Sequence, residues 1–309
     1  MKLIKRIIHL PFNILNNLVK KTNWYKNTIP DISIYPGDKW YRDNLERNFD
    51  AVNLGSSSAL YAFDYSSTRL KAFNWAMQPQ SMDYSFKVLK QYFSILKKGG
   101  IVIIPFCPFS ALSTKGKWPA TYNDRYYYFL DPVLIDDYEQ VAFRRKYPLK
   151  AFPKASIKHL IKDAPAKRAN ISTCNSDKEF ENDAARWITM WSNEFNITDL
   201  DADVSNENKA GMQERRTTIE NMLDFCIERD LRPIIVIPPM HPALSRKFSN
   251  TFRNNYIHSF LSPICEKRNV IIKDYIQDKR FTANALFYNS FFMSKEGAQL
   301  FTKTLFEEI

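Results

Sequence analysis

The stretch FDAVNLGSSSALYAF, residues 49–63, decides how this chain folds. A short apolar run leads into Gly55 and then into three consecutive serines, Ser56, Ser57 and Ser58. This pattern predicts a buried strand that turns sharply into a helix. In parallel α/β proteins, binding and catalytic groups gather where the strands end at their carboxyl side. The stretch therefore predicts a serine hydroxyl at that edge of a parallel sheet.

Strand and helix patterns alternate along the rest of the chain. After the strand at 51–54, strand patterns recur at residues 70–76, 101–106, 233–238 and 270–274, and helical patterns at 81–98, 214–230, 242–268 and 294–309. The runs at 101–106 and 233–238 are rich in β-branched residues, which is typical of strands buried on both faces. Gly99 and Gly100 are expected to end one helix, and Ser294 to cap another. The alternation predicts a doubly wound sheet of five parallel strands with right-handed crossovers.

By pattern, the chain divides into a helix, a linker and one α/β domain. Residues 1–21 form a basic amphipathic helix, residues 22–48 a polar linker, and residues 49–309 the α/β domain. The interval at about 107–210 is too long for a structureless loop, so we expect a largely helical insertion there. Its aromatic group, Tyr122 and residues 126–129, either stacks on sugar rings or packs against the core.

The segment at residues 2–21 has apolar side chains along one helical stripe and basic side chains largely elsewhere. It is too polar to span a bilayer, and it lacks the small-residue cleavage site of a signal peptide. Such a helix either lies on an anionic membrane surface or packs on its own chain or a partner. We therefore expect a cytoplasmic protein, held at the inner face of the membrane if this helix binds lipid.

Composition limits the function classes further. Of the 309 residues, 45% are hydrophobic, which predicts a globular chain rather than a disordered one. The net charge of +11 favours an anionic partner such as a membrane surface, a glycan or a nucleotide donor. No zinc-finger spacing or aromatic RNA-binding motif is present, so nucleic acid is not expected. Four cysteines without a CxxC pair fit a reducing compartment, and Cys107, which follows a strand pattern, is interpreted as a packed thiol.

A second motif, FYNSFFMSKEGAQLFT, lies near the C-terminus at residues 287–302. Together with the serine turn it resembles the SGNH/GDSL hydrolase superfamily, whose members are esterases, lipases and O-acyltransferases. The resemblance implies a flavodoxin-like three-layer α/β/α sandwich with Ser57 as the nucleophile. Gly55, Ser56 and Ser58 would then shape the turn, and backbone N–H groups after it would hold an oxyanion.

The residues expected to activate Ser57 are absent from this sequence. By the resemblance, Asn289 and Phe292 stand where the family has its aspartate and its histidine. A serine hydroxyl is a poor nucleophile until a base takes its proton, and loss of general-base action removes ~10²–10⁴ in rate. His241 follows the strand at 233–238, at the same sheet edge, and is therefore the candidate base. The alternative is a histidine that caps the next helix.

These observations leave two functions open. In the first, implied by the resemblance, the protein is an O-acyltransferase or esterase that acts on a bacterial surface polysaccharide with non-standard catalytic residues. In the second, it is an inactive SGNH-like pseudoenzyme that binds a glycan, or a partner enzyme of polysaccharide biosynthesis, in the former active-site cleft. Both predict a carbohydrate or an acylated small molecule as ligand, with no metal and no cofactor.

Overall fold

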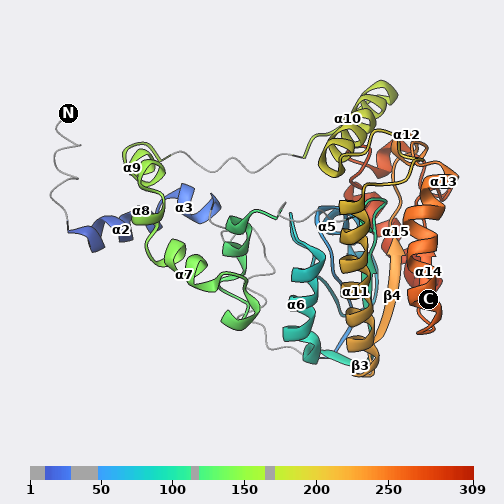
Figure 1. The fold of residues 1–309 in the computed structure, drawn as a ribbon, viewed down its shortest axis with the longest axis horizontal. Coiled ribbons are helices and arrows are strands. Elements are labelled where there is room, and N and C mark those ends of the chain that lie inside the picture. The colour runs from blue at the N-terminus through green and yellow to red at the C-terminus, as the bar shows by residue number, and fades with distance from the viewer. Residues whose placement is uncertain (1–10, 29–47, 113–117, 164–170) are drawn as a thin grey trace. The chain divides into compact units, whose positions relative to one another are not determined.

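A computed structural model describes residues 11–28, 48–112, 118–163 and 171–309 of the chain (Figure 1). The contacts within the chain define two compact units, and each is considered by itself. Unit 1 comprises residues 1–45 and 118–170, and unit 2 comprises residues 46–117 and 171–309. The described part of unit 1 is helical, whereas unit 2 contains a sheet.

Five parallel strands form the sheet of unit 2. In spatial order they are β2 (Ala72–Asn74), β1 (Phe49–Asn53), β3 (Leu96–Pro105), β4 (Arg232–Ile237) and β5 (Ile271–Asp274). The chain moves outward from β1 to β2 and then crosses to the other side of β1, which is the strand order of flavodoxin-like folds. The fold class expected from the sequence is therefore confirmed.

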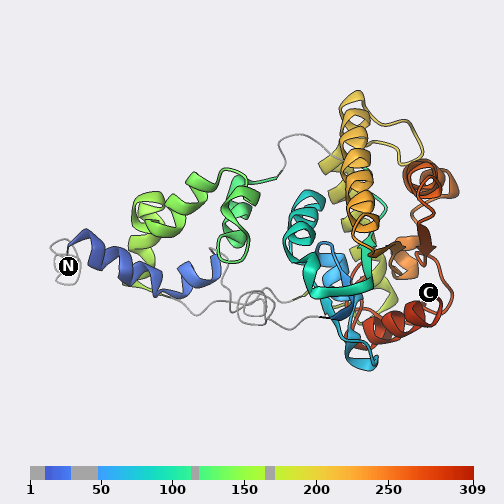
Figure 2. The ribbon, with the colours of Figure 1, turned by 90° about the horizontal axis from the view of Figure 1, so that it is seen from below.

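Helices cover both faces of this sheet. On one face, α11 (Asn206–Ile227) packs against α6 (Met82–Tyr92) and α14 (Ser259–Glu266). On the other, α15 (Lys295–Glu307) packs against α5 (Ser57–Ala62), and Figure 2 shows α15, in red, across the sheet from α6 and α11. The β-branched parts of the central strands, residues 102–104 of β3 and 234–237 of β4, are accordingly buried, as their composition predicts.

Two helix predictions need correction. The helix expected over residues 81–98 ends at Tyr92, and β3 begins at Leu96, which pairs with Phe49 of β1. Gly99 and Gly100 therefore lie within β3 instead of ending a helix, and Gly99 has a φ of +71°. The strand forms earlier than expected because pairing with β1 outweighs the local helical pattern.

The helix expected over residues 242–268 is interrupted. It consists of α12 (Pro242–Ser245), α13 (Asn250–Arg253), a π-helical turn at Asn254–His258, and then α14. A new helix start causes the first break, because the Ser249 hydroxyl accepts the N–H of Phe252 at 3.0 Å. The cap predicted at Ser294 is confirmed, since its hydroxyl accepts the N–H of Gly297 at 3.1 Å.

Unit 1 combines segments from two distant parts of the chain. Its described residues form the helices α2 (Phe12–Lys20), α3 (Asn23–Thr28), η3 (Ala120–Tyr126), η4 (Pro132–Leu134), α7 (Tyr138–Lys146), α8 (Pro148–Ala151) and α9 (Pro153–Ile161). Helix α2 packs against α8 and α9. The Asn16 amide joins α2 to the other segment: it donates to Lys146 O at 2.8 Å and accepts from Leu149 N at 3.2 Å.

This arrangement differs from the boundaries that the sequence suggested. The described part of the amphipathic helix at 1–21 packs within unit 1, with Val19 fully buried, and the expected linker at 22–48 contains α3. Residues 1–10 and 29–47 of these segments lie outside the described residues. The aromatic group at 126–129 contributes Tyr126 and Phe129 to a packed interior, as the core-packing interpretation predicts.

Candidate functional site

The serine turn, residues 55–58, lies at the carboxyl end of β1 and leads into α5. Gly55 has a φ of +117°, a conformation that residues with a side chain rarely adopt. A Cβ at this position would lie 2.7 Å from Ala59 Cβ and 3.3 Å from Pro105 Cγ. The sequence thus folds locally as predicted, because only glycine fits between the first turn of α5 and the end of β3.

The three serine hydroxyls have different environments. The Ser56 hydroxyl accepts the N–H of Gln80 at 3.1 Å, and the Ser58 hydroxyl lies 3.1 Å from Cys107 Sγ. Ser57 is the first residue of α5 and is partly exposed. Its hydroxyl makes no hydrogen bond to any residue that the structure describes. The expected nucleophile is therefore not hydrogen-bonded to a base among these residues.

The loops after β2 and β3 hold the serine turn in place. The Gln80 side chain donates to the carbonyl oxygens of Gly55 at 3.1 Å and Trp75 at 3.3 Å. After β3, burial raises the pKa of the Cys107 thiol to about 11, against the smaller opposing influence of its hydrogen bond to Ser58. Cys107 is thus protonated at neutral pH, which fits a packed thiol and not an activated one.

His241, the candidate base, is engaged by its own surroundings. Its Nδ1 accepts the N–H of Ala243 at 3.2 Å, which caps α12, so Nε2 carries the proton and donates to Asn284 Oδ1 at 2.9 Å. The ring is buried and stacks on Phe180 with 3.8 Å between centroids. No hydrogen bond joins His241 to Ser57 within the described chain. The geometry matches the alternative of a helix-capping histidine.

The pKa of His241 should make stability depend on pH. Burial lowers this pKa, and the hydrogen bond to Asn284 opposes the effect. The folded state favours the neutral ring, so its contribution is complete above the unfolded pKa of about 6.5 and is lost as the pH falls. We expect the free energy of unfolding to fall more between pH 7 and 5 for wild type than for His241→Asn, which keeps a capping oxygen. Urea unfolding at several pH values measures this, and parallel curves would contradict it.

Asn289 and Phe292, which the SGNH resemblance would align with a catalytic acid and base, support the loop before α15. The Asn289 Oδ1 accepts the N–H groups of Phe291 at 3.0 Å and Phe292 at 2.9 Å. The Phe292 ring lies 4.8 Å from the ring of Tyr61, measured between centroids. Tyr61 is one helical turn beyond Ser57 on α5, hence on the same face. An apolar ring thus packs beside the serine turn, on the helix face that carries Ser57.

Sequence reasoning did not identify Asp183, which fixes this loop from α10 (Asp177–Phe195). Its buried Oδ2 accepts both the hydroxyl of Ser290 at 2.6 Å and the N–H of Ser290 at 3.0 Å. Asn284 also donates to Asp177 Oδ1 at 2.8 Å. These contacts span about a hundred residues of sequence, so no local pattern points to them. Helix α10, part of the expected insertion, therefore covers the loop that carries the second motif.

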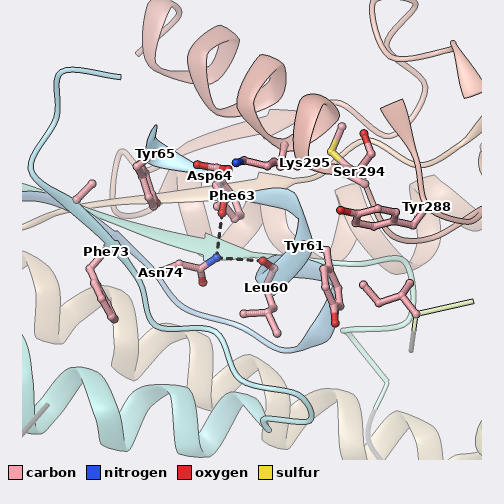
Figure 3. Close-up of a pocket in the computed structure, with 14 residues that line it drawn as sticks. Leu60, Tyr61, Phe63, Asp64, Tyr65, Phe73, Asn74, Tyr288, Ser294 and Lys295 are labelled. Atoms are coloured by element: carbon pink, nitrogen blue, oxygen red, sulfur yellow. Dashed lines mark hydrogen bonds between the residues drawn. The ribbon is translucent and has the colours of Figure 1, made fainter. Parts of the chain in front are cut away.

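An open pocket of about 490 Å³ lies between α5, β2 and the start of α15 (Figure 3). Tyr61 and Tyr288 stand at one end, and Asp64 and Lys295 lie along its upper edge. The Asn74 amide uses its hydrogens on the fold, since it donates to Leu60 O at 3.3 Å and Phe63 O at 3.1 Å.

Two polar groups of the pocket are available to a ligand. Within the described chain, neither the Tyr288 hydroxyl nor the Lys295 ammonium has a partner. Tyrosine faces beside polar groups are suited to a sugar ring. No group of three or more His, Cys, Asp or Glu side chains among the described residues is arranged to hold a metal ion.

Comparison with protein-family models and with curated proteins found no match to this chain.

Proposed function

We propose that this protein is an SGNH-like binding protein without ester-hydrolase activity. It holds a carbohydrate or an acylated small molecule in the pocket that begins on α5, one turn beyond Ser57. The observation that carries this proposal is that no base among the described residues is hydrogen-bonded to the Ser57 hydroxyl, on a helix whose adjoining pocket remains open. Polysaccharide biosynthesis is the setting that the SGNH resemblance suggests.

The surroundings of Ser57 support binding over catalysis. The His241 ring nitrogens are both used in holding α12 and Asn284, and Phe292 packs on Tyr61. Without a base, a serine hydroxyl forms an acyl-enzyme slowly, because its proton has no acceptor as the new bond forms. A partly exposed Ser57 at the start of α5 is the observation that favours residual acyl chemistry, the second candidate function.

A direct test compares wild type with Ser57→Ala. We expect both proteins to hydrolyse p-nitrophenyl acetate at the same background rate, and a fluorophosphonate probe to label neither. Turnover that disappears in Ser57→Ala, together with labelling of Ser57, would contradict the proposal and establish the esterase or acyltransferase.

The binding arm of the same test uses N-acetylglucosamine oligomers and O-acetylated monosaccharides, measured by saturation-transfer NMR. Tyr288→Ala removes one aromatic face of the pocket and should weaken binding about tenfold, since a lost aromatic contact is worth roughly 1.4 kcal/mol. Tyr147→Ala, in unit 1, is the matched control and should leave binding unchanged. No signal with either class of sugar would reject a carbohydrate ligand.

The proposal includes a cytoplasmic location. All four cysteines are free, which supports a reducing compartment. Within the described ranges, no helix combines the length and apolar character that crossing a bilayer requires.

A further inference from the structure

The basic charge of this protein is concentrated in unit 1. Residues 1–45 and 118–170 carry 18 Lys and Arg against 9 Asp and Glu, a net charge of +9. Unit 2 carries 26 against 24, a net charge of +2 in more than twice the length. An anionic partner is therefore expected to bind unit 1. The excess of positive charge lies outside unit 2, which contains the pocket.

Unit 1 also exposes apolar side chains in pairs four residues apart. Helix α2 exposes Ile14 and Leu18, and α9 exposes Ile157 and Ile161. A spacing of four places both members of a pair on one face of a helix. The exposed apolar side chains are not the ones that hold unit 1 together, since α2 already buries Val19 within the unit.

Lysines flank the exposed isoleucines of α9. Lys154, Lys158 and Lys162 follow one another at intervals of four and are exposed. In the described part of the chain, none of these ammonium groups forms an ion pair. Apolar side chains set between unpaired lysines are the pattern of helices that lie in the interface of an anionic bilayer.

We propose that unit 1 docks on an anionic membrane surface through α2 and α9. The lysines meet the lipid phosphates, and the exposed isoleucines and Leu18 enter the boundary between headgroups and acyl chains. The positive charge of unit 1 is complementary to the negative charge of the lipid headgroups, and this favours an anionic membrane as the partner. A nucleic acid would use the lysines but gain nothing from the aliphatic pairs. The surface thus draws on both the N-terminal segment and the insertion, and it is independent of the function proposed for unit 2.

Vesicle flotation of the full-length protein tests this docking. We expect recovery with vesicles of phosphatidylcholine containing 30% phosphatidylglycerol, and at least tenfold weaker binding to pure phosphatidylcholine. Lys154→Gln, Lys158→Gln and Lys162→Gln together should weaken binding about a hundredfold, because each cation near such a surface contributes about fivefold.

Apolar variants separate insertion from charge attraction. Ile157→Ser with Ile161→Ser should weaken binding about 25-fold, since each half-exposed isoleucine contributes about fivefold when it leaves water. The matched control is Ile227→Ser with Leu300→Ser in unit 2, because Ile161 and Ile227 are equally exposed at 44%. This control should bind like wild type, and thermal melts should show all variants folded.

Three outcomes would overturn the proposal. The first is no recovery with the anionic vesicles, and the second is equal recovery with pure phosphatidylcholine. The third is binding that the lysine variant abolishes, that double-stranded DNA competes away, and that the isoleucine variant leaves unchanged, which would assign the surface to a polyanion. Ile14→Ser with Leu18→Ser on α2 provides a second apolar variant if the α9 variant unfolds.

Discussion

Replacing Gly297 by alanine should lower the free energy of unfolding by about 3 to 5 kcal/mol, because the added methyl group meets backbone. A Cβ at position 297 would lie 2.1 Å from Leu286 O and 2.9 Å from Leu286 C. The Leu286 carbonyl already accepts the N–H of Ser294 at 2.9 Å. Alanine must therefore push this loop away from the start of α15 and break that hydrogen bond. Urea unfolding followed by circular dichroism measures the change.

The control for this prediction is Gly99→Ala. At Gly99 alanine would have to adopt an unfavourable backbone conformation, with a φ of +71°, but a Cβ there meets no atom within 4 Å. We expect a loss of about 1 to 2 kcal/mol, the cost of the conformation alone. If both variants lost the same stability, the close approach of α15 to Leu286 would not be the cause.

Asp183→Ala should be the second strongly destabilising substitution, with a loss of about 3 to 5 kcal/mol. The aspartate accepts two hydrogen bonds from Ser290, and Ser290 is fully buried. Alanine leaves both donors unsatisfied in a place that water does not reach. Asp183→Asn keeps an acceptor oxygen and loses the charge, so we expect about 1 to 2 kcal/mol. The graded loss is measured by urea unfolding.

Glu194→Ala is the matched control, because Glu194 is an exposed carboxylate on the same helix, α10. Its effect should stay within about 0.5 kcal/mol. Hydrogen exchange adds a local readout: amides at 284–292 should exchange faster in Asp183→Ala than in Glu194→Ala. Unchanged exchange would mean that α10 does not hold the loop.

The central strands show what local pattern can predict. The β-branched runs at 101–106 and 233–238 correspond to β3 and β4, since strands buried on both faces need continuous apolar sequence. Residues 93–98 show its limit. Their spacing continues the helical pattern of α6, yet Leu96 pairs with Phe49 of β1. The partner strand lies more than forty residues earlier, and a window of one helix does not contain it.

The candidate site also contains features that a local pattern predicts and features that depend on distant residues. Gly55 and the turn into α5 were predictable, because a glycine between a strand and a helix has a local conformational reason. The cap that His241 forms on α12 was one of the two alternatives, because its partner Ala243 is only two residues away. The hydrogen bond of His241 to Asn284 and the role of Asp183 were not predictable, since each depends on a neighbour from a distant segment. His241 donates to Asn284, and Asp183 accepts from Ser290. Hydrogen bonds between distant segments leave no periodic signal along the sequence.

The sequence by itself determined the parallel α/β fold, the serine turn and the excess of positive charge. The fold and the turn follow from patterns among neighbouring residues, and the charge follows from composition. Folding changes neither the order of the residues nor their number. Only the tertiary structure decided that the N-terminal helix and part of the insertion form one unit, which holds +9 of the +11 charge. Asn16 meets Lys146 across 130 residues of chain, and no local pattern in either segment names a partner that far away.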